Sequence, residues 1–199
     1  HSYLGYSLSP RIKATDDAEL FCNSCRLIFP VVPSEHFRMV MRSFSPFLKP
    51  YHILIHGTKG LDVEPELYNR TPLILDRKEV FTMSEIIEQE TQVLRVGCVS
   101  GPNLAEEIMD EQPTATVIAS EFKEVIEQGK KVLNCSVFRV FESSEIRGAE
   151  LAGAFKNIIA IGSGILQGRG LGKNIQAMLI TKGLSEIIYL GKALDIHPS

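Results

Sequence analysis

The sequence has no tryptophan and no large surplus of charge of either sign. Its 199 residues include 21 lysines and arginines against 24 aspartates and glutamates, a formal net charge of −3 at pH 7. A chain so close to neutrality lacks the extended positive field that attracts nucleic acid or an anionic membrane surface. We therefore expect neither nucleic acid nor a membrane among its partners.

A long uninterrupted apolar run is also missing. The longest apolar stretch, residues 158–166, is broken by glycines and a serine and is far shorter than the roughly 20 residues that span a bilayer. The first residues include no methionine and lack the layout of a signal peptide. The sequence thus predicts no transmembrane segment, and its opening reads as the interior of a longer chain.

Cysteine is scarce, with four residues. Cys22 and Cys25 form the motif CNSC, whereas Cys98 and Cys135 stand singly in apolar runs. A zinc site needs a second close pair or histidines at ligand spacing, and a redox pair is expected to open a helix after a strand. We expect four unpaired thiols in a reducing compartment, with no metal site. This favours the cytoplasm, with a plastid as the alternative.

The first two thirds of the chain alternate between strand-like and helix-like segments. The strand-like runs are residues 26–32, 51–56, 93–101, 114–120 and 137–141. Helices are expected at 34–44 and 82–90, where Ser34 and Thr82 can act as caps, and at 102–111 and 120–133. This alternation predicts an α/β fold with a mainly parallel, doubly wound sheet.

The pattern changes after Phe141. From Glu145 onward there is no strand candidate, and two long helical segments flank the sequence GRGLGKN, in which Asn174 can cap the second helix. We therefore expect an α/β domain over residues 1–142 and the first helices of an all-α domain over residues 143–199.

The glycines near this turn resemble a nucleotide-binding loop only superficially. A dinucleotide fingerprint follows a strand and opens a helix, whereas GSGILQG and GRGLGK lie inside and after a helix. The Walker spacing also fails, because Gln167 stands where the first glycine should be and Asn174 follows Lys173. These glycines predict helix packing and a turn, and the rest of the sequence contains no such fingerprint.

Three short segments are candidates for a site. Lys59, in GTKG, and the segment SGPN, residues 100–103, each follow a strand, and open α/β sheets bind ligands at the carboxyl ends of their strands. Lys156, in ELAGAFKN, stands in an otherwise apolar helix, where burying a charge is costly. Each segment has a plainer explanation: a solvated turn lysine, a simple connection, and a lysine whose head group reaches water.

Together the segments carry a family resemblance. The order VPS, TKG, SGPNLAEE, PTA, FRV, ELAGAFKN, GLGKN and ITKGLSE resembles the NAD(P)-dependent sn-glycerol-3-phosphate dehydrogenases along essentially the whole chain. ELAGAFKN is its most specific part. Shorter similarities exist in β-hydroxyacid dehydrogenases, which also place a lysine and an asparagine on the first helix of a helical domain. Lys59 and SGPN favour the glycerol phosphate enzymes.

The resemblance implies a Rossmann-type first domain, an all-helical second domain and a substrate cleft between them. It implies reversible oxidation of sn-glycerol 3-phosphate to dihydroxyacetone phosphate, with hydride transfer to NAD or NADP, in an enzyme that is a homodimer when complete. The family's first strand and glycine-rich loop should precede His1, and its phosphate-binding loop should follow Ser199. The chain therefore resembles the central portion of the enzyme, and we expect this portion alone to be inactive.

The resemblance also implies roles for individual residues. Lys156 would bind substrate and act as the general acid/base on the C2 hydroxyl. Lys59 would contact substrate and cofactor, Gly101 and Asn103 would line the substrate site, and Ala105 would approach the nicotinamide. A lysine base needs a pKa near 7 to 8, and desolvation beside another ammonium group would lower it from about 10.4. The alternatives are a β-hydroxyacid-type dehydrogenase and a non-catalytic fragment that acts as an interaction module.

Overall fold

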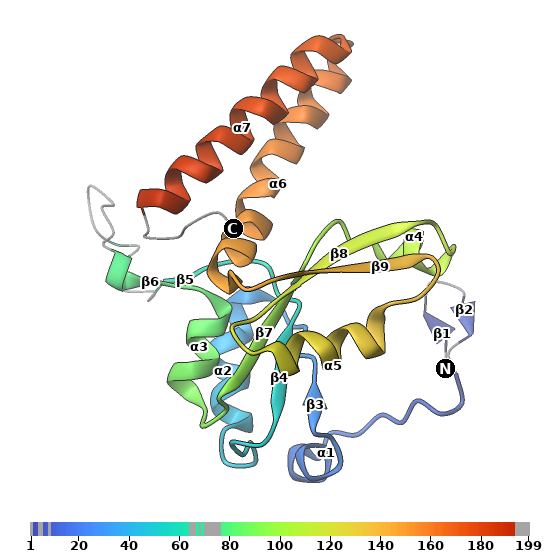
Figure 1. Cartoon of the computed structure of the whole chain (residues 1–199), viewed down its shortest axis with the longest axis vertical. Coiled ribbons are helices and arrows are strands. Elements are labelled where there is room, and N and C mark those ends of the chain that lie inside the picture. The colour runs from blue at the N-terminus through green and yellow to red at the C-terminus, as the bar shows by residue number, and fades with distance from the viewer. Residues whose placement is uncertain are drawn as a thin grey trace.

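A five-stranded sheet forms the centre of the molecule, and a long helical hairpin projects from it (Figure 1). The computed structural model describes residues 2–3, 6–7, 9–63, 67, 69 and 77–193. In spatial order the sheet contains β3 (Leu27–Ile28), β4 (Ile53–His56), β7 (Arg95–Ser100), β8 (Thr114–Ala119) and β9 (Phe138–Ser143). Two small hairpins flank it: β1 (Ser2–Tyr3) with β2 (Tyr6–Ser7), and β5 (Asp62–Val63) with β6 (Val80–Phe81), which the short helix η2 (Arg77–Glu79) precedes.

The sheet is mainly parallel, as the sequence predicts, with one exception. The pairs β3–β4, β4–β7 and β8–β9 are parallel, but β8 runs antiparallel to β7. A parallel neighbour needs a crossover long enough to return the chain to the starting edge of the sheet. The connection from β7 to β8 contains only the short α4 (Ala105–Met109), so the chain reverses direction. The α/β class and the Rossmann-like arrangement are confirmed.

Helices cover both faces of the sheet. The helices α2 (Ser34–Phe44) and α3 (Met83–Glu90) pack on one face and α5 (Lys123–Leu133) on the other, while α1 (Ala18–Ser24) lies next to β3 in sequence. Alternation along β4 separates the two cores: Leu54 joins the cluster under α2 and α3, whereas Ile53 and Ile55 contact Val125 of α5. Because both faces are covered, β4 is buried along its length.

One helix start agrees with the sequence prediction and several differ, including that of α5, which begins at Lys123 rather than at residue 120. Thr82 caps α3 in a capping box with Glu85. Ser34 was the predicted cap of α2, but Pro33 holds the extended cap conformation and Ser34 is the first helical residue. Helix α4 begins at Ala105 rather than at Pro102, because residues 101–104 form a turn. Asn174 does not precede the last helix, which already begins at Lys173.

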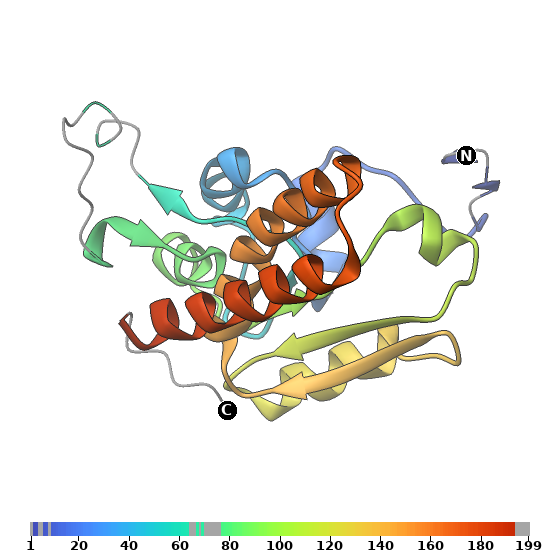
Figure 2. The same cartoon turned by 90° about the horizontal axis from the view of Figure 1, so that it is seen from above.

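The last two helices form an antiparallel hairpin that stands out from the sheet (Figures 1 and 2). They are α6 (Ile146–Gly168) and α7 (Lys173–Ala193). Gly170 turns the chain with a positive φ of 71°. A Cβ on Gly162 would lie 3.0 Å from Leu179, and one on Gly183 would lie 2.5 Å from Ile159, so glycine lets the helices approach closely. The predicted helix packing and turn are confirmed, and a domain boundary at residue 143 stays a prediction.

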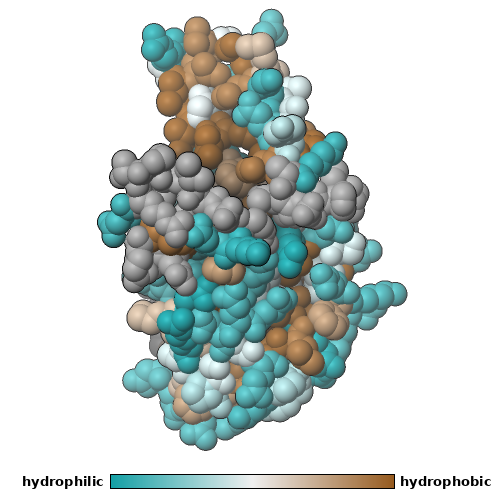
Figure 3. All heavy atoms as spheres, turned by 90° about the vertical axis from the view of Figure 1, so that its left-hand side faces the viewer, coloured by the Kyte–Doolittle hydropathy of each residue, from teal (hydrophilic) through white to brown (hydrophobic). Residues whose placement is uncertain are grey.

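The hairpin carries exposed apolar side chains, visible as the brown upper part of the surface in Figure 3. They include Ile158, Ile161, Ile165, Met178 and Leu184. By length and composition alone, α6 is long and apolar enough to span a membrane. The sequence did not predict this, because α6 contains no long uninterrupted apolar run. Its first turns nevertheless pack on β7, and they carry side chains that bond within the protein.

Candidate functional site

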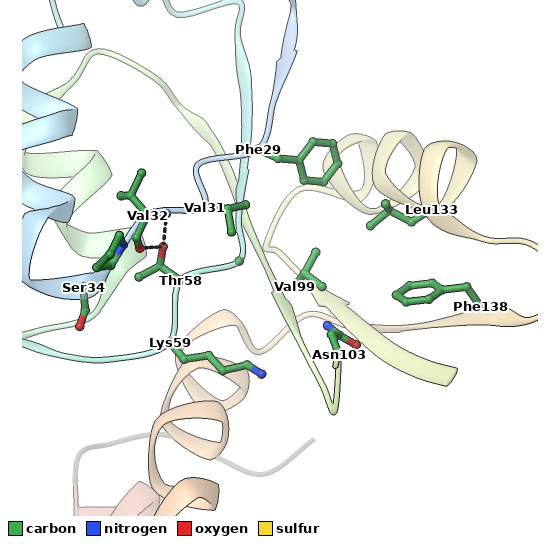
Figure 4. A pocket seen from close by; sticks show the side chains of 12 residues that line it. Phe29, Val31, Val32, Ser34, Thr58, Lys59, Val99, Asn103, Leu133 and Phe138 are labelled. Carbon is green, nitrogen blue, oxygen red and sulfur yellow. Dashed lines mark hydrogen bonds between the residues drawn. The ribbon is translucent and has the colours of Figure 1, made fainter. Parts of the chain in front are cut away.

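Loops that follow β3, β4 and β7 meet at one end of the sheet, because the carboxyl ends of parallel strands share an edge. A cavity of about 560 Å³ lies there. We call it the strand-end cavity. Its walls include Phe29, Val31, Lys59, Val99, Asn103 and Phe138 (Figure 4). Apolar and aromatic side chains form most of this wall, and the lysine and the asparagine supply polar groups on one side.

Two lysines from distant parts of the chain converge on a single carbonyl group beside this cavity. Lys59 Nζ donates to the carbonyl oxygen of Gly101 at 2.8 Å, and Lys156 Nζ donates to the same oxygen at 3.2 Å. Lys59 follows β4, Gly101 follows β7, and Lys156 stands on α6. The structure thus brings together three of the residues that the sequence analysis singled out.

The lysine pair is an unbalanced concentration of positive charge. Burial lowers the pKa of Lys59, and the neighbouring Lys156 ammonium lowers that pKa further. Within the described residues, neither lysine forms an ion pair with a carboxylate. Two half-buried cations without a neutralising partner favour an anion between them.

Close packing at the start of α6 places Lys156. The Ser100 hydroxyl, at the end of β7, donates to the carbonyl oxygen of Ala149 at 2.9 Å. One turn further along α6, a Cβ on Gly153 would lie 2.8 Å from that same hydroxyl oxygen. A glycine at position 153 therefore lets the helix lie against the strand end, with Lys156 one turn beyond it.

Asn103 belongs to the turn that presents the Gly101 carbonyl. Its Nδ2 donates to the Thr116 hydroxyl at 3.1 Å, while its Oδ1 is enclosed and has no hydrogen-bond partner among the described residues. A Cβ on Gly101 would lie 2.8 Å from Thr116 Oγ1 and 3.0 Å from the Ala115 carbonyl oxygen, so this position requires glycine.

Ala105 does not reach the strand-end cavity. It is the first residue of α4, is exposed, and is not part of the cavity wall. Its predicted contact with the nicotinamide stays a prediction. The cysteines also lie apart from the cavity wall, and all four are free thiols.

A buried polar cluster that the sequence did not predict lies next to this site. Both carboxylate oxygens of Glu150 accept bonds from Ser84, one from its backbone N–H at 2.8 Å and one from its hydroxyl at 2.6 Å. Nε2 of His56 lies 2.9 Å from the same carboxylate. Burial alone would raise the pKa of Glu150, but His56 and the Ser84 bonds lower it overall. The only sequence signal was position: His56 directly precedes GTKG, and Glu150 opens ELAGAFKN.

Comparison with known proteins shows which family this chain matches. Residues 1–126 match the family model for the N-terminus of NAD-dependent glycerol-3-phosphate dehydrogenase, and residues 145–199 match the model for its C-terminus. A glycerol-3-phosphate dehydrogenase [NAD(P)+] from Psychrobacter arcticus is 37% identical over 98% of this chain and 42% of its own length. One from Teredinibacter turnerae is 37% identical over 97% of this chain and 53% of its own length.

A solved structure shows the same fold. The crystal structure of glycerol-3-phosphate dehydrogenase from Coxiella burnetii superposes with a TM-score of 0.82 and 29% identity, covering 98% of this chain and 55% of that one. The present chain thus spans about half the length of the relatives that it matches. The family matches cover most of the sequence and the fold agrees with the solved structure, so the chain belongs to the NAD-dependent glycerol-3-phosphate dehydrogenase family.

Proposed function

We propose that the full-length protein is an NAD(P)-dependent glycerol-3-phosphate dehydrogenase that interconverts sn-glycerol 3-phosphate and dihydroxyacetone phosphate. The observation that carries this proposal is the convergence of Lys59 and Lys156 on the Gly101 carbonyl oxygen beside the strand-end cavity. Both the substrate and the product of this reaction carry a phosphate dianion, which suits a pair of lysines without a carboxylate partner.

The two lysines have distinct roles in this proposal. Lys156 accepts the C2 hydroxyl proton during oxidation and returns it to the carbonyl oxygen in the reverse direction. A lysine takes up a proton only when it is neutral, so Lys156 acts as the base in its unprotonated form. Lys59 binds the substrate anion and stabilises negative charge on the reacting oxygen.

The residues present fit a nicotinamide cofactor, NAD or NADP. Phe29, Val31, Val99 and Phe138 give the strand-end cavity apolar walls, and Lys59 and Asn103 add polar groups at one side. A site of this composition suits an aromatic ring with a polar substituent. When bound, a nicotinamide would supply the hydride acceptor for oxidation at C2. Lys59 would contact both the substrate and the cofactor, and the turn of Gly101 and Asn103 would border the substrate.

We place this protein in the cytoplasm, with a plastid as the alternative. Four free thiols agree with a reducing compartment. We further propose that the complete protein is a homodimer, and that its substrate and cofactor are small molecules rather than nucleic acid or membrane components. The exposed apolar side chains of the α6–α7 hairpin support the homodimer, because they offer a surface for contact between two copies of the protein.

The test is a comparison of substrates with the full-length gene product. Initial rates are measured with NAD and with NADP, using sn-glycerol 3-phosphate and short β-hydroxy acids. Turnover of sn-glycerol 3-phosphate is the expected result. Turnover of a hydroxy acid in its place would identify a β-hydroxyacid-type dehydrogenase. Absence of turnover with every substrate would favour the non-catalytic interaction module.

A further inference from the structure

The Thr116 hydroxyl bridges the two ends of the turn that presents the Gly101 carbonyl. Thr116 lies on β8, and its side chain is 2% exposed. Its Oγ1 donates to the carbonyl oxygen of Ser100 at 3.2 Å and accepts from Nδ2 of Asn103 at 3.1 Å. These two partners lie on either side of Gly101 in the sequence. One buried hydroxyl therefore joins Ser100, just before Gly101, to Asn103, two residues after it.

This bridge holds the outer end of the turn. Nδ2 of Asn103 bonds to the Thr116 hydroxyl, whereas Oδ1 has no partner among the described residues. The bond to Thr116 is thus the one hydrogen bond that this side chain forms within the described part of the chain. The backbone N–H of Asn103 also donates to the Gly101 carbonyl oxygen, at 3.1 Å. Movement of Asn103 therefore moves a group in direct contact with the oxygen on which the lysines converge.

The direction of the two bonds makes the hydroxyl necessary. Because Oγ1 gives its single proton to Ser100, only its lone pairs remain for Asn103, and the amide must present its NH₂ group. A flipped amide would place two acceptors against each other and would lose this bond. The bridge thus fixes both the position of the turn and the orientation of the amide.

We propose that Thr116 is a positioning residue, which sets the geometry of the Lys59–Lys156 pair by bridging Ser100 and Asn103 around Gly101. The hydrogen bonds of the Thr116 side chain reach this turn, so its effect on the lysines passes through the Gly101 carbonyl. Its importance for catalysis rests on the function proposed above, whereas its effect on the lysine pair does not.

The first experiment measures kinetics of the full-length gene product with sn-glycerol 3-phosphate. T116V keeps the shape and removes the hydroxyl, whereas T116S keeps the hydroxyl and removes a methyl group. We expect T116V to lower kcat/KM about tenfold, mainly through kcat, because a lost hydrogen bond leaves the lysines poorly placed. T116S should stay within about threefold of the unmodified enzyme. T114V is the control, since the Thr114 hydroxyl bonds locally to the Gln112 carbonyl oxygen.

If Thr116 acted only through packing, T116S would lose more activity than T116V, because T116S leaves a small cavity and T116V does not. Wild-type rates in T116V, or equal losses in T116V and T116S, would overturn the proposal. In an N103A background the bridge is already absent, so adding T116V should cost nothing further. Additive losses in this double-mutant cycle would also overturn it.

The second experiment does not depend on turnover. Acetic anhydride labels neutral amines, and mass spectrometry compares labelling of Lys59 with that of the exposed Lys123 near pH 8. Separating the lysine pair removes the neighbouring ammonium, so T116V and N103A should each reduce relative labelling of Lys59 at least threefold. N103A serves where T116V fails to fold. Unchanged labelling in the folded variants would overturn the proposal, whereas reduced labelling in a protein that does not turn over glycerol 3-phosphate would overturn only the proposed function.

Discussion

At the scale of single residues, Lys156 is expected to act on the chemical step. In the full-length gene product, K156A should lower kcat by about 10²- to 10⁴-fold, the usual contribution of general acid/base catalysis. NADH affinity, measured by fluorescence titration, should change little, because the loss concerns the transition state. K123A is the control, since the Lys123 side chain is 89% exposed. A loss below about tenfold in K156A would indicate a solvated lysine without a catalytic role.

Lys59 is expected to behave differently from Lys156. K59A should raise the KM for sn-glycerol 3-phosphate and also reduce kcat, because a cation next to the dianionic substrate is lost. Steady-state kinetics over a range of substrate concentrations separate the two effects. An unchanged KM in K59A would remove Lys59 from the substrate site.

Gly101 is expected to tolerate no side chain. In G101A the new Cβ would lie 3.0 Å from the Ala115 carbonyl oxygen, a backbone atom that has little freedom to move. We expect a loss of about 1–3 kcal/mol in the free energy of unfolding, as for other overpacked sites. In G164A the Cβ meets nothing within 4 Å, so this helix-interior variant should gain about 0.5–1 kcal/mol. Denaturant unfolding measures the free energy of unfolding of both variants. Equal losses in G101A and G164A would contradict this view of Gly101.

At the scale of elements, Glu150 joins three of them. It stands on α6, accepts bonds from the first turn of α3, and contacts His56 at the end of β4. Its pKa is lower in the folded protein than the ordinary 4.5. Its contribution to stability is therefore complete above about pH 4.5 and disappears as the pH falls through the lower, folded pKa.

E150Q should flatten the acid limb of the stability curve for this reason. We expect a loss of about 1–3 kcal/mol at pH 7, where bonds to a charged acceptor are replaced by bonds to a neutral one. Chemical unfolding between pH 3 and 7 measures both effects. E107Q, a change at an exposed position of α4, should leave the curve unaltered. An acid limb of equal slope in E150Q would show that other carboxyl groups control acid unfolding.

The elements also show what a sequence reveals and what it does not. Local patterns predicted most helices and strands, and Thr82 predicted a helix start correctly; the structure adds that Glu85 completes a capping box there. The caps predicted at Ser34 and Asn174 were wrong, because a cap depends on the backbone conformation of the residue and not on its side chain alone. The direction of β8 depends on the length of the preceding connection.

The site was predictable in part for a related reason. Lys59, Gly101 and Lys156 stand out as special residue types at strand ends or in an apolar helix, so the sequence singles them out. Glu150, His56 and Thr116 act through partners far away in the sequence, and no local pattern distinguishes them from ordinary polar residues. Tertiary contacts were needed to find them.

At the scale of the whole molecule, residues 1–199 alone should associate and should not catalyse. The hairpin exposes Ile161 and Ile165, which are 66% and 58% exposed, and the sequence contains no glycine-rich dinucleotide loop. We expect size-exclusion chromatography to show species larger than 22.1 kDa, and NADH titration to show very weak binding. I161E should reduce the association. V132E, an equivalent change on α5, should not. Micromolar NADH binding would show that these residues contain a nucleotide site of another kind.

The shared carbonyl oxygen of Gly101 has a practical consequence for assays of the full-length gene product. A neutral oxygen is a weak acceptor for two ammonium groups, and any compact dianion is a stronger one. We therefore expect inorganic phosphate and sulfate to compete with sn-glycerol 3-phosphate for the lysine pair of the full-length gene product. A phosphate buffer or an ammonium sulfate stock should raise the apparent KM, whereas a buffer of zwitterionic amines with chloride as the counterion should not.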